Sequence, residues 1–251
     1  WQVFIAAEYY LPLYFQSVMS ASPILSGLHI LPLTLFEAFV SITAGVIIHR
    51  TGRYQELIWG GMAMLTLGTG LYINIDASSS LGKIIGFEIV AGIGAGMLFE
   101  PPLIALQALV AQDDIATATA TLGFIRNLAT SMSVVIAGVV IQNSMSQRSG
   151  TLRAAGLSDE LLSEFTGGDA AANVNKIASI MDVAQRDAVK EAFAWSLQRT
   201  WILMTAMAGF GLLASFFIIK AVLSKEHTET KTGIKEKQPI PEPQAPREVE
   251  I

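Results

Sequence analysis

Six long apolar runs follow one another along the chain, with short polar segments between them. The runs cover residues about 1–18, 28–48, 57–75, 81–106, 122–141 and 195–219. A bilayer core of about 30 Å is crossed by roughly 20 mostly apolar residues in a helix. These runs are too long and too apolar for amphipathic surface helices. The pattern therefore predicts an all-α membrane protein with six transmembrane helices.

Turn-forming and basic residues give the runs an order and a direction. Polar turns stand at 20–23 (SASP), 76–80 (DASSS) and 112–114 (QDD). Arg50 and Arg53 lie between the second and third runs, and five lysines follow the sixth. An even number of spans places both basic regions on one side, which the positive-inside rule makes cytoplasmic.

The organisation outside the runs is also predicted. Residues 1–223 are expected to form the transmembrane bundle, with an extracellular loop at about 142–194. Within that loop, Ser158 is expected to cap a helix that begins with two acidic residues. An amphipathic helix on the outer surface is expected to lead into the sixth run. Its apolar positions are Ile177, Ile180, Met181, Ala184, Ala188 and Ala192. Residues 224–251, rich in Lys, Glu and Pro, are expected to be a disordered cytoplasmic tail.

Composition narrows the function classes. Hydrophobic residues make up 52% of the 251 residues and charged residues 15%, against roughly 25% charged in soluble domains. The chain has no cysteine, its three histidines lie far apart, and no basic stripe suggests nucleic-acid binding. We therefore expect no enzyme, no catalytic residues and no metal site. Because residue 1 already lies in an apolar run, we expect the chain to be a fragment of a longer protein.

The stretch 90–102 (VAGIGAGMLFEPP) invites comparison with a nucleotide-binding loop. The dinucleotide fingerprint needs G-x-G-x-x-G between a strand and a helix, whereas these glycines alternate at 92, 94 and 96 inside an apolar run. Gly92 and Gly96 instead place small residues four apart, which is typical of close helix packing in lipid. We therefore expect these two glycines to pack against a neighbouring helix.

The segment 45–54 (GVIIHRTGRY) resembles the loop signature of the major facilitator superfamily, G-x-x-x-D-R-x-G-R-[RK]. Gly45, Arg50, Gly52 and Arg53 match it. His49 and the residue at 54 depart from it, so the acidic partner of the family's gating salt bridge is missing from this copy. The match predicts a cytoplasmic loop in which Gly45 permits close packing and Gly52 a tight turn.

Further segments resemble the C-terminal six-helix half of fungal fourteen-spanning drug:proton antiporters, over about residues 9–233. They are 10–16 (YLPLYFQ), 22–27 (SPILSG), 102–107 (PLIALQ), 123–128 (GFIRNL) and 225–229 (KEHTE). The resemblance implies half of a major facilitator fold, which needs a missing N-terminal half and the lipid bilayer. It implies export of small organic molecules, drugs or secondary metabolites, driven by protons and without a bound cofactor.

The resemblance favours the plasma membrane, with a vacuolar or other internal membrane as the alternative. Two other functions stay open. One is an importer or siderophore-type transporter of the same fold, and the other is a truncated membrane protein that transports nothing.

Ionisable residues inside the runs are the candidates for a transport pathway, since each costs at least about 2.5–3.5 kcal/mol on insertion scales. Glu37 stands near the middle of the second run, where desolvation disfavours its ionised form. It fits a proton carrier and, equally, a protonated hydrogen-bond donor to a neighbouring helix. Glu8, Lys83 and Glu88 stand nearer to run ends, and we expect them to reach the interface.

Glu100 and Arg126 enter the bundle from the same side on consecutive runs. We expect them to face each other, either as a cytoplasmic gate or as a static bridge. Two prolines after Glu100 are expected to bend its helix. Tyr10, Tyr14 and Asn127 complete the pathway candidates. The tyrosines belong to a cluster with Tyr9 and Phe15 that fits either a substrate cavity or helix packing.

Overall fold

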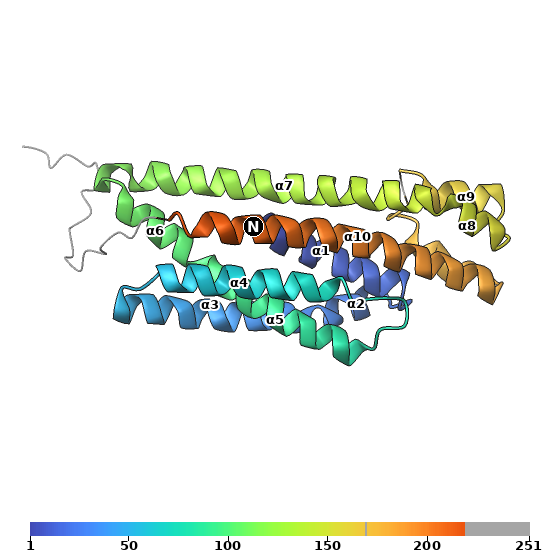
Figure 1. The fold of residues 1–251 in the computed structure, drawn as a ribbon, viewed down its shortest axis with the longest axis horizontal. Coiled ribbons are helices and arrows are strands. Elements are labelled where there is room, and N and C mark those ends of the chain that lie inside the picture. Colours follow the sequence, from blue (N-terminus) through green and yellow to red (C-terminus); the bar gives the residue numbers. More distant parts are fainter. Residues whose placement is uncertain (169, 219–251) are drawn as a thin grey trace, which may run out of the picture.

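A computed structural model describes residues 1–168 and 170–218, and these contain helices and no strand. The helices are α1 (Gln2–Ser17), α2 (Pro23–His29), α3 (Leu31–Thr51), α4 (Gln55–Tyr72), α5 (Leu81–Phe99), α6 (Pro101–Leu109), α7 (Ile115–Gln147), α8 (Ser149–Ala154), α9 (Asp159–Thr166) and α10 (Val183–Ser215). Short 3-10 helices are η1 (Gln112–Asp114) and η2 (Val174–Ser179). The long helices lie side by side along one axis, and α8 and α9 gather at one end (Figure 1). The predicted tail at 224–251 lies outside the described residues.

Within residues 1–168 and 170–218, three helical segments are long and apolar enough to cross a membrane. They are Pro23–Thr51, Leu81–Leu109 and Gln112–Gln147. The other three predicted spans correspond to α1, α4 and α10, which run beside these segments (Figure 1). The membrane protein is thus helical as expected, and the six-span topology stays a prediction.

The helix α5 lies between α3 and α4, and small residues bring the three backbones close. A Cβ added at Gly92 would lie 2.5 Å from the backbone oxygen of Leu33 on α3. On the other face of α5, Ala91 meets Gly68 of α4, where an added Cβ would lie 2.6 Å from the Ala91 Cα. The stretch 90–102 therefore lies in helices and contains no loop able to cradle a phosphate.

The break predicted beside the two prolines is confirmed. The helix α5 ends at Phe99 and α6 begins at Pro101, with Glu100 between them. Since Pro101 and Pro102 have no backbone N–H, they cannot continue the hydrogen-bond ladder of α5. The amide of Leu103 bonds instead to the Glu100 carbonyl at 3.0 Å.

The predicted connection at 142–194 contains more helix than the apolar runs indicated. The helix α7 continues to Gln147, and α10 begins at Val183, capped by Asp182, whose Oδ1 accepts a bond from the Ala184 amide at 2.8 Å. Both helices run on through residues that are polar but mostly helix-compatible, which hydropathy alone leaves out. The intervening α8, α9 and η2 form a small cap at one end of the bundle.

The predicted amphipathic helix begins later than expected, and it runs into the sixth predicted span as expected. Ile177 lies in η2 and Met181 is exposed before α10 begins. From Val183 onward the segment is continuous with the predicted sixth span, in one helix of 33 residues. Its Phe193 is fully buried inside the fold.

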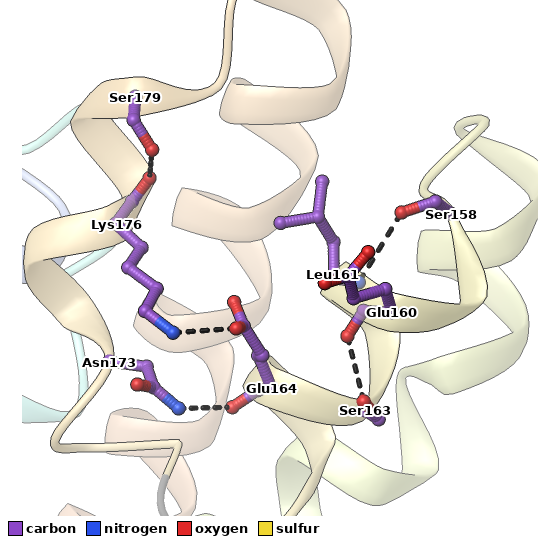
Figure 2. A network of polar contacts seen from close by, with 8 residues as sticks. All are labelled: Ser158, Glu160, Leu161, Ser163, Glu164, Asn173, Lys176 and Ser179. Atoms are coloured by element: carbon purple, nitrogen blue, oxygen red, sulfur yellow. Dashed lines mark hydrogen bonds and ion pairs between the residues drawn. The ribbon is translucent and has the colours of Figure 1, made fainter.

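The cap is fastened to α10 by apolar packing and by a polar network on its surface. Phe165 of α9 packs edge-on against Phe193 of α10, with ring centroids 6.3 Å apart. Figure 2 shows Lys176 paired with the Glu164 carboxylate at 2.5 Å, beside Asn173, whose Nδ2 donates to the Glu164 carbonyl at 3.1 Å. Exposed ion pairs contribute at most about 1 kcal/mol, so the buried rings dominate the attachment.

The predicted cap at Ser158 is confirmed, since its Oγ accepts a bond from the Leu161 amide at 3.3 Å (Figure 2). At the opposite end of the bundle, α10 is held to α4 by two side chains. Trp59 donates to the Ser215 carbonyl at 3.0 Å, and Gln55 donates to the Ile218 carbonyl at 2.8 Å.

Candidate functional site

The loop between α3 and α4 contains the four residues singled out by the sequence signature. Gly52 ends α3 with a φ of 71° and donates its amide to the Ile48 carbonyl at 2.7 Å. This left-handed conformation favours glycine, so the tight turn expected at Gly52 is present. Arg50 is exposed in the last turn of α3.

Arg53 has an acidic partner that the signature did not indicate. Its Nε lies 2.9 Å from Oε1 of Glu56, in the first turn of α4. The close packing expected of Gly45 is not present among the described residues, because an added Cβ there would have no atom within 4 Å. The α3 face that carries Gly45 is open.

Two carboxylates from different helices lie within electrostatic range of each other, away from the α3–α4 loop. Glu37 of α3 and Glu8 of α1 are both partly buried, and they interact electrostatically. No basic side chain pairs with either in the part of the chain that the structure describes. Glu8 does not simply reach the interface, as the sequence suggested. It brings a second carboxyl into the range of Glu37.

Glu8 also lines an open cavity of about 520 Å³. Its neighbours there include Tyr9, which is 53% exposed, and the amide side chain of Gln16. Pro12, Leu13, Gly168, Ala171, Ala172 and Val174 line the rest. The cavity therefore combines one acidic group, one aromatic ring and apolar walls from α1 and the cap.

Tyr10 and Tyr14 turn away from that cavity and are almost fully buried. The Tyr10 hydroxyl donates to the Val134 carbonyl of α7 at 2.6 Å, and Tyr14 donates to the Asp76 carbonyl at 2.7 Å. Both contacts join α1 to other parts of the chain. Of the two uses that the sequence left open, these hydroxyls serve helix packing, although Tyr10 also borders a smaller cavity of about 220 Å³.

The expected ion pair between Glu100 and Arg126 does not form among the described residues. The Arg126 guanidinium donates instead to the Phe99 carbonyl at 2.7 Å, and it stacks over the Trp1 and Phe99 rings at 4.7 and 5.4 Å. Glu100 remains close enough for an electrostatic interaction with Arg126.

The helix break explains this choice of partner. Because the Leu103 amide bonds to the Glu100 carbonyl, the Phe99 carbonyl lacks its helical donor and can accept from Arg126. Asn127, the residue after Arg126, takes no part in this contact: its side chain is exposed on α7, and its carbonyl accepts a bond from Ser131 at 3.2 Å. The break thus supplies Arg126 with a backbone acceptor that the sequence did not indicate.

Glu88 was placed wrongly by its distance from the run end. It does not reach the interface but is fully buried, and both its carboxyl oxygens lack a hydrogen-bond partner. Lys83, one turn earlier on α5, does reach the loop, where its Nζ donates to the Asn74 carbonyl at 2.6 Å. Their positions in the sequence could not show that Glu88 is buried and Lys83 is not, because the rotation of α5 about its axis decides which side chain points inward.

The chain resembles known fungal transporters over most of its length. It is 43% identical over 232 residues to the efflux pump dotC of Dothistroma septosporum, an alignment that covers 92% of this chain and 39% of that protein. It is 40% identical over 231 residues to the MFS-type transporter ppz2 of Metarhizium majus, covering 92% and 40%. An MFS-type transporter of Aspergillus terreus is 38% identical over 227 residues, covering 90% and 41%.

No family model and no solved structure matches the chain. The chain spans about two fifths of the length of the curated relatives it matches. Their names agree with the apolar helical segments and with the signature at the α3–α4 loop. The chain therefore belongs to the major facilitator superfamily of membrane transporters.

Proposed function

We propose that the chain is the C-terminal half of a secondary transporter that exports small organic molecules in exchange for protons. The observation that carries the proposal is the pair Glu8 and Glu37. Both are partly buried, on α1 and α3, and neither has a basic partner among the described residues. One of the relatives is named an efflux pump.

The substrate path in this proposal lies along the open face of α1 and α3. Large apolar side chains of α3 are exposed on that helix, namely Leu35, Phe36, Phe39, Ile42, Val46 and Ile47. Such a face is too apolar to remain in contact with water. In the proposal it borders lipid and the N-terminal half, which is outside this chain and completes the substrate site at the bilayer midplane.

Protons supply the energy in this proposal, and no bound cofactor takes part. Two carboxyls within electrostatic range disfavour each other's ionisation, so the pair can take up one proton without needing a basic partner. Binding a substrate between the two halves changes the surroundings of the pair and favours release of that proton. Glu37 is the proposed carrier, and Glu8 tunes it while facing the cavity with Tyr9.

The test uses the full-length transporter in proteoliposomes with an imposed proton gradient. Ethidium and rhodamine 6G serve as probes, because both are flat, amphipathic dyes whose movement is followed by fluorescence. We expect dye to move against its gradient only while the proton gradient lasts. Accumulation in the direction of the protons would instead support an importer of the same fold. Dye movement at the same rate with and without the proton gradient would contradict proton coupling.

A further inference from the structure

Glu88 is the most completely buried carboxyl group in the described part of the chain. Its side chain has no exposed surface, and neither carboxyl oxygen has a hydrogen-bond partner. Burial alone makes the ionised form of this carboxyl costly, because no charged group pairs with it among the described residues. An ionised carboxylate in such a place is so costly that the group takes up a proton instead.

A second unpartnered polar group lies on the neighbouring helix α4. Tyr72, the last residue of α4, is also fully buried, and its hydroxyl has no hydrogen-bond partner. Tyr72 and Glu88 interact electrostatically across the α4–α5 contact. The Tyr72 ring is fixed from its other side by Trp201 of α10, at 5.0 Å between ring centroids. Two unsatisfied buried groups thus lie on the packed helices α4 and α5, within electrostatic range of each other.

The surrounding packing keeps water out. One turn away on both helices, Gly68 and Ala91 are in backbone contact. Ile84, one turn before Glu88 on α5, is fully buried. Thr69 offers no alternative partner, because its hydroxyl already donates to the Leu65 carbonyl at 2.9 Å. In this conformation no surface of Glu88 is open to water.

The two protonation states of Glu88 have different requirements. A protonated carboxyl and a tyrosine hydroxyl can each donate and accept, so a small approach satisfies both. An ionised carboxylate only accepts, and Tyr72 offers it one donor. The remaining lone pairs and the whole charge then need water. The closed contact therefore suits the protonated acid, and the ionised form requires an open one.

We propose that Glu88 is a second proton-binding site, occluded in this conformation, and that Tyr72 positions it. Proton release is a simple transfer: water enters between α4 and α5, the carboxyl O–H bond breaks, and the proton passes to that water. No electrons are transferred. The inference rests on the proposed proton-coupled transport and adds a site separate from Glu37.

The other ionisable groups on the packed helices stand apart from Glu88. On α3, Glu37 lies beside Gly96, two turns or about 12 Å further along α5 at 1.5 Å per residue. Glu100 lies beyond that, where α5 gives way to α6, and α6 itself has no ionisable side chain. His29, at the end of α2, packs its ring against Phe15 at 5.1 Å. Among the described residues, Tyr72 is thus the ionisable group that interacts with Glu88.

The experiment uses the full-length transporter with Glu88→Gln, which keeps the size of the side chain and its ability to donate and accept. Three quantities are compared with the wild type: dye binding, dye exchange without a gradient, and dye accumulation with a proton gradient. Proton release on dye binding is measured in detergent with a pH indicator. Glu160→Gln is the control, because Glu160 is an exposed carboxylate on α9.

We expect Glu88→Gln to bind and exchange dye like the wild type but to lose gradient-driven accumulation and to release fewer protons. Tyr72→Phe should keep coupling and dye affinity while moving the pH profile of transport to higher pH, because ionised Glu88 loses its donor. Glu160→Gln should behave as the wild type.

Two results overturn the inference. One is a Glu88→Gln variant with unchanged accumulation and proton release. The other is a variant that no longer binds dye, since that result assigns Glu88 a structural role. If the wild type itself shows no gradient-driven transport, the proposed function fails instead, and the two failures are thereby distinguished.

Discussion

Gly96 of α5 lies directly against the backbone oxygen of Glu37 on α3. A Cβ added at Gly96 would come within 2.5 Å of that oxygen. The missing side chain therefore sets how closely α3 approaches α5 at the level of the proposed proton carrier. A helix contact, and not a polar partner, fixes the place of Glu37 in the bundle.

Replacing Gly96 with alanine should push α3 away from α5. Because the clash is with backbone, which cannot rotate aside, we expect a loss of about 1–3 kcal/mol of stability, typical of overpacking. The thermal unfolding midpoint of the purified full-length protein measures this. Gly86→Ala, also within α5, is the matched control, since an added Cβ there meets nothing within 4 Å. Equal effects at both positions would refute the role assigned to this contact.

Glu37→Gln should abolish the dependence of dye export on the proton gradient, because an amide cannot carry the proton. We expect transport to fall to the rate seen with the gradient collapsed, while dye binding is retained. Dye fluorescence in proteoliposomes gives the rate. Glu164→Gln is a control on the cap, where the exposed pair with Lys176 is lost without effect on coupling. Full gradient-driven export by Glu37→Gln would exclude this residue as the carrier.

Arg126→Met should destabilise the junction between α5 and α6. It removes a charged hydrogen bond to the Phe99 carbonyl, worth about 1.5–3 kcal/mol. Arg153→Met, which removes an exposed pair with Asp159, should cost less than about 1 kcal/mol. Unfolding midpoints of both variants are compared.

The Arg126 effect should survive in a Glu100→Gln background, because the bond is to backbone and not to the Glu100 carboxylate. A double-mutant cycle from the same unfolding data measures the coupling. If Arg126→Met caused little destabilisation in the Glu100→Gln background, the ion pair with Glu100, and not the bond to the Phe99 carbonyl, would be the main contact of Arg126.

The loop between α4 and α5 should be stable above the acid range and loosen at low pH. Hydrogen bonds from the Ser78 hydroxyl and amide, and from the Ser79 hydroxyl, hold the pKa of Asp76 below its ordinary value of 3.8. Because the pKa of Asp76 is lower in the folded than in the unfolded protein, these hydrogen bonds stabilise the loop above pH 3.8. This stabilisation is lost as the pH falls through the pKa of Asp76 in the folded protein. The rate of hydrogen exchange at the Ser78 amide measures the loosening of the loop. Asp76→Asn should exchange faster at neutral pH, whereas Asp159→Asn in the cap should leave this amide unchanged.

The apolar runs predicted where long helices lie, because burial in lipid requires long uncharged stretches whatever the tertiary contacts. Strong local signals also worked: two prolines ended α5 at Phe99, and Ser158 capped α9. Both depend on chemistry within a few residues. Hydropathy missed the ends of α7 and α10, because a helix can continue through polar residues once it packs against the cap.

The surroundings of the individual charged residues in the apolar runs could not be predicted from local sequence. Glu8, Lys83 and Glu88 all lie within the first eight residues of their runs, yet one lines a cavity, one reaches a loop and one is buried. Their surroundings depend on the rotation of each helix about its axis, which the tertiary fold decides. The predicted partner of Arg126 failed for a related reason, since the free carbonyl of Phe99 arises only from the geometry of the break.

The helix α10 runs without interruption from the cap, where Phe193 meets Phe165, to the end where Trp59 and Gln55 bond to the Ser215 and Ile218 carbonyls. At 1.5 Å per residue its 33 residues extend about 50 Å. An α-helix resists bending because its backbone bonds run along the axis. A tilt of the cap is therefore expected to move the other end of α10, beside the start of α4, in the opposite direction, as in a rigid lever.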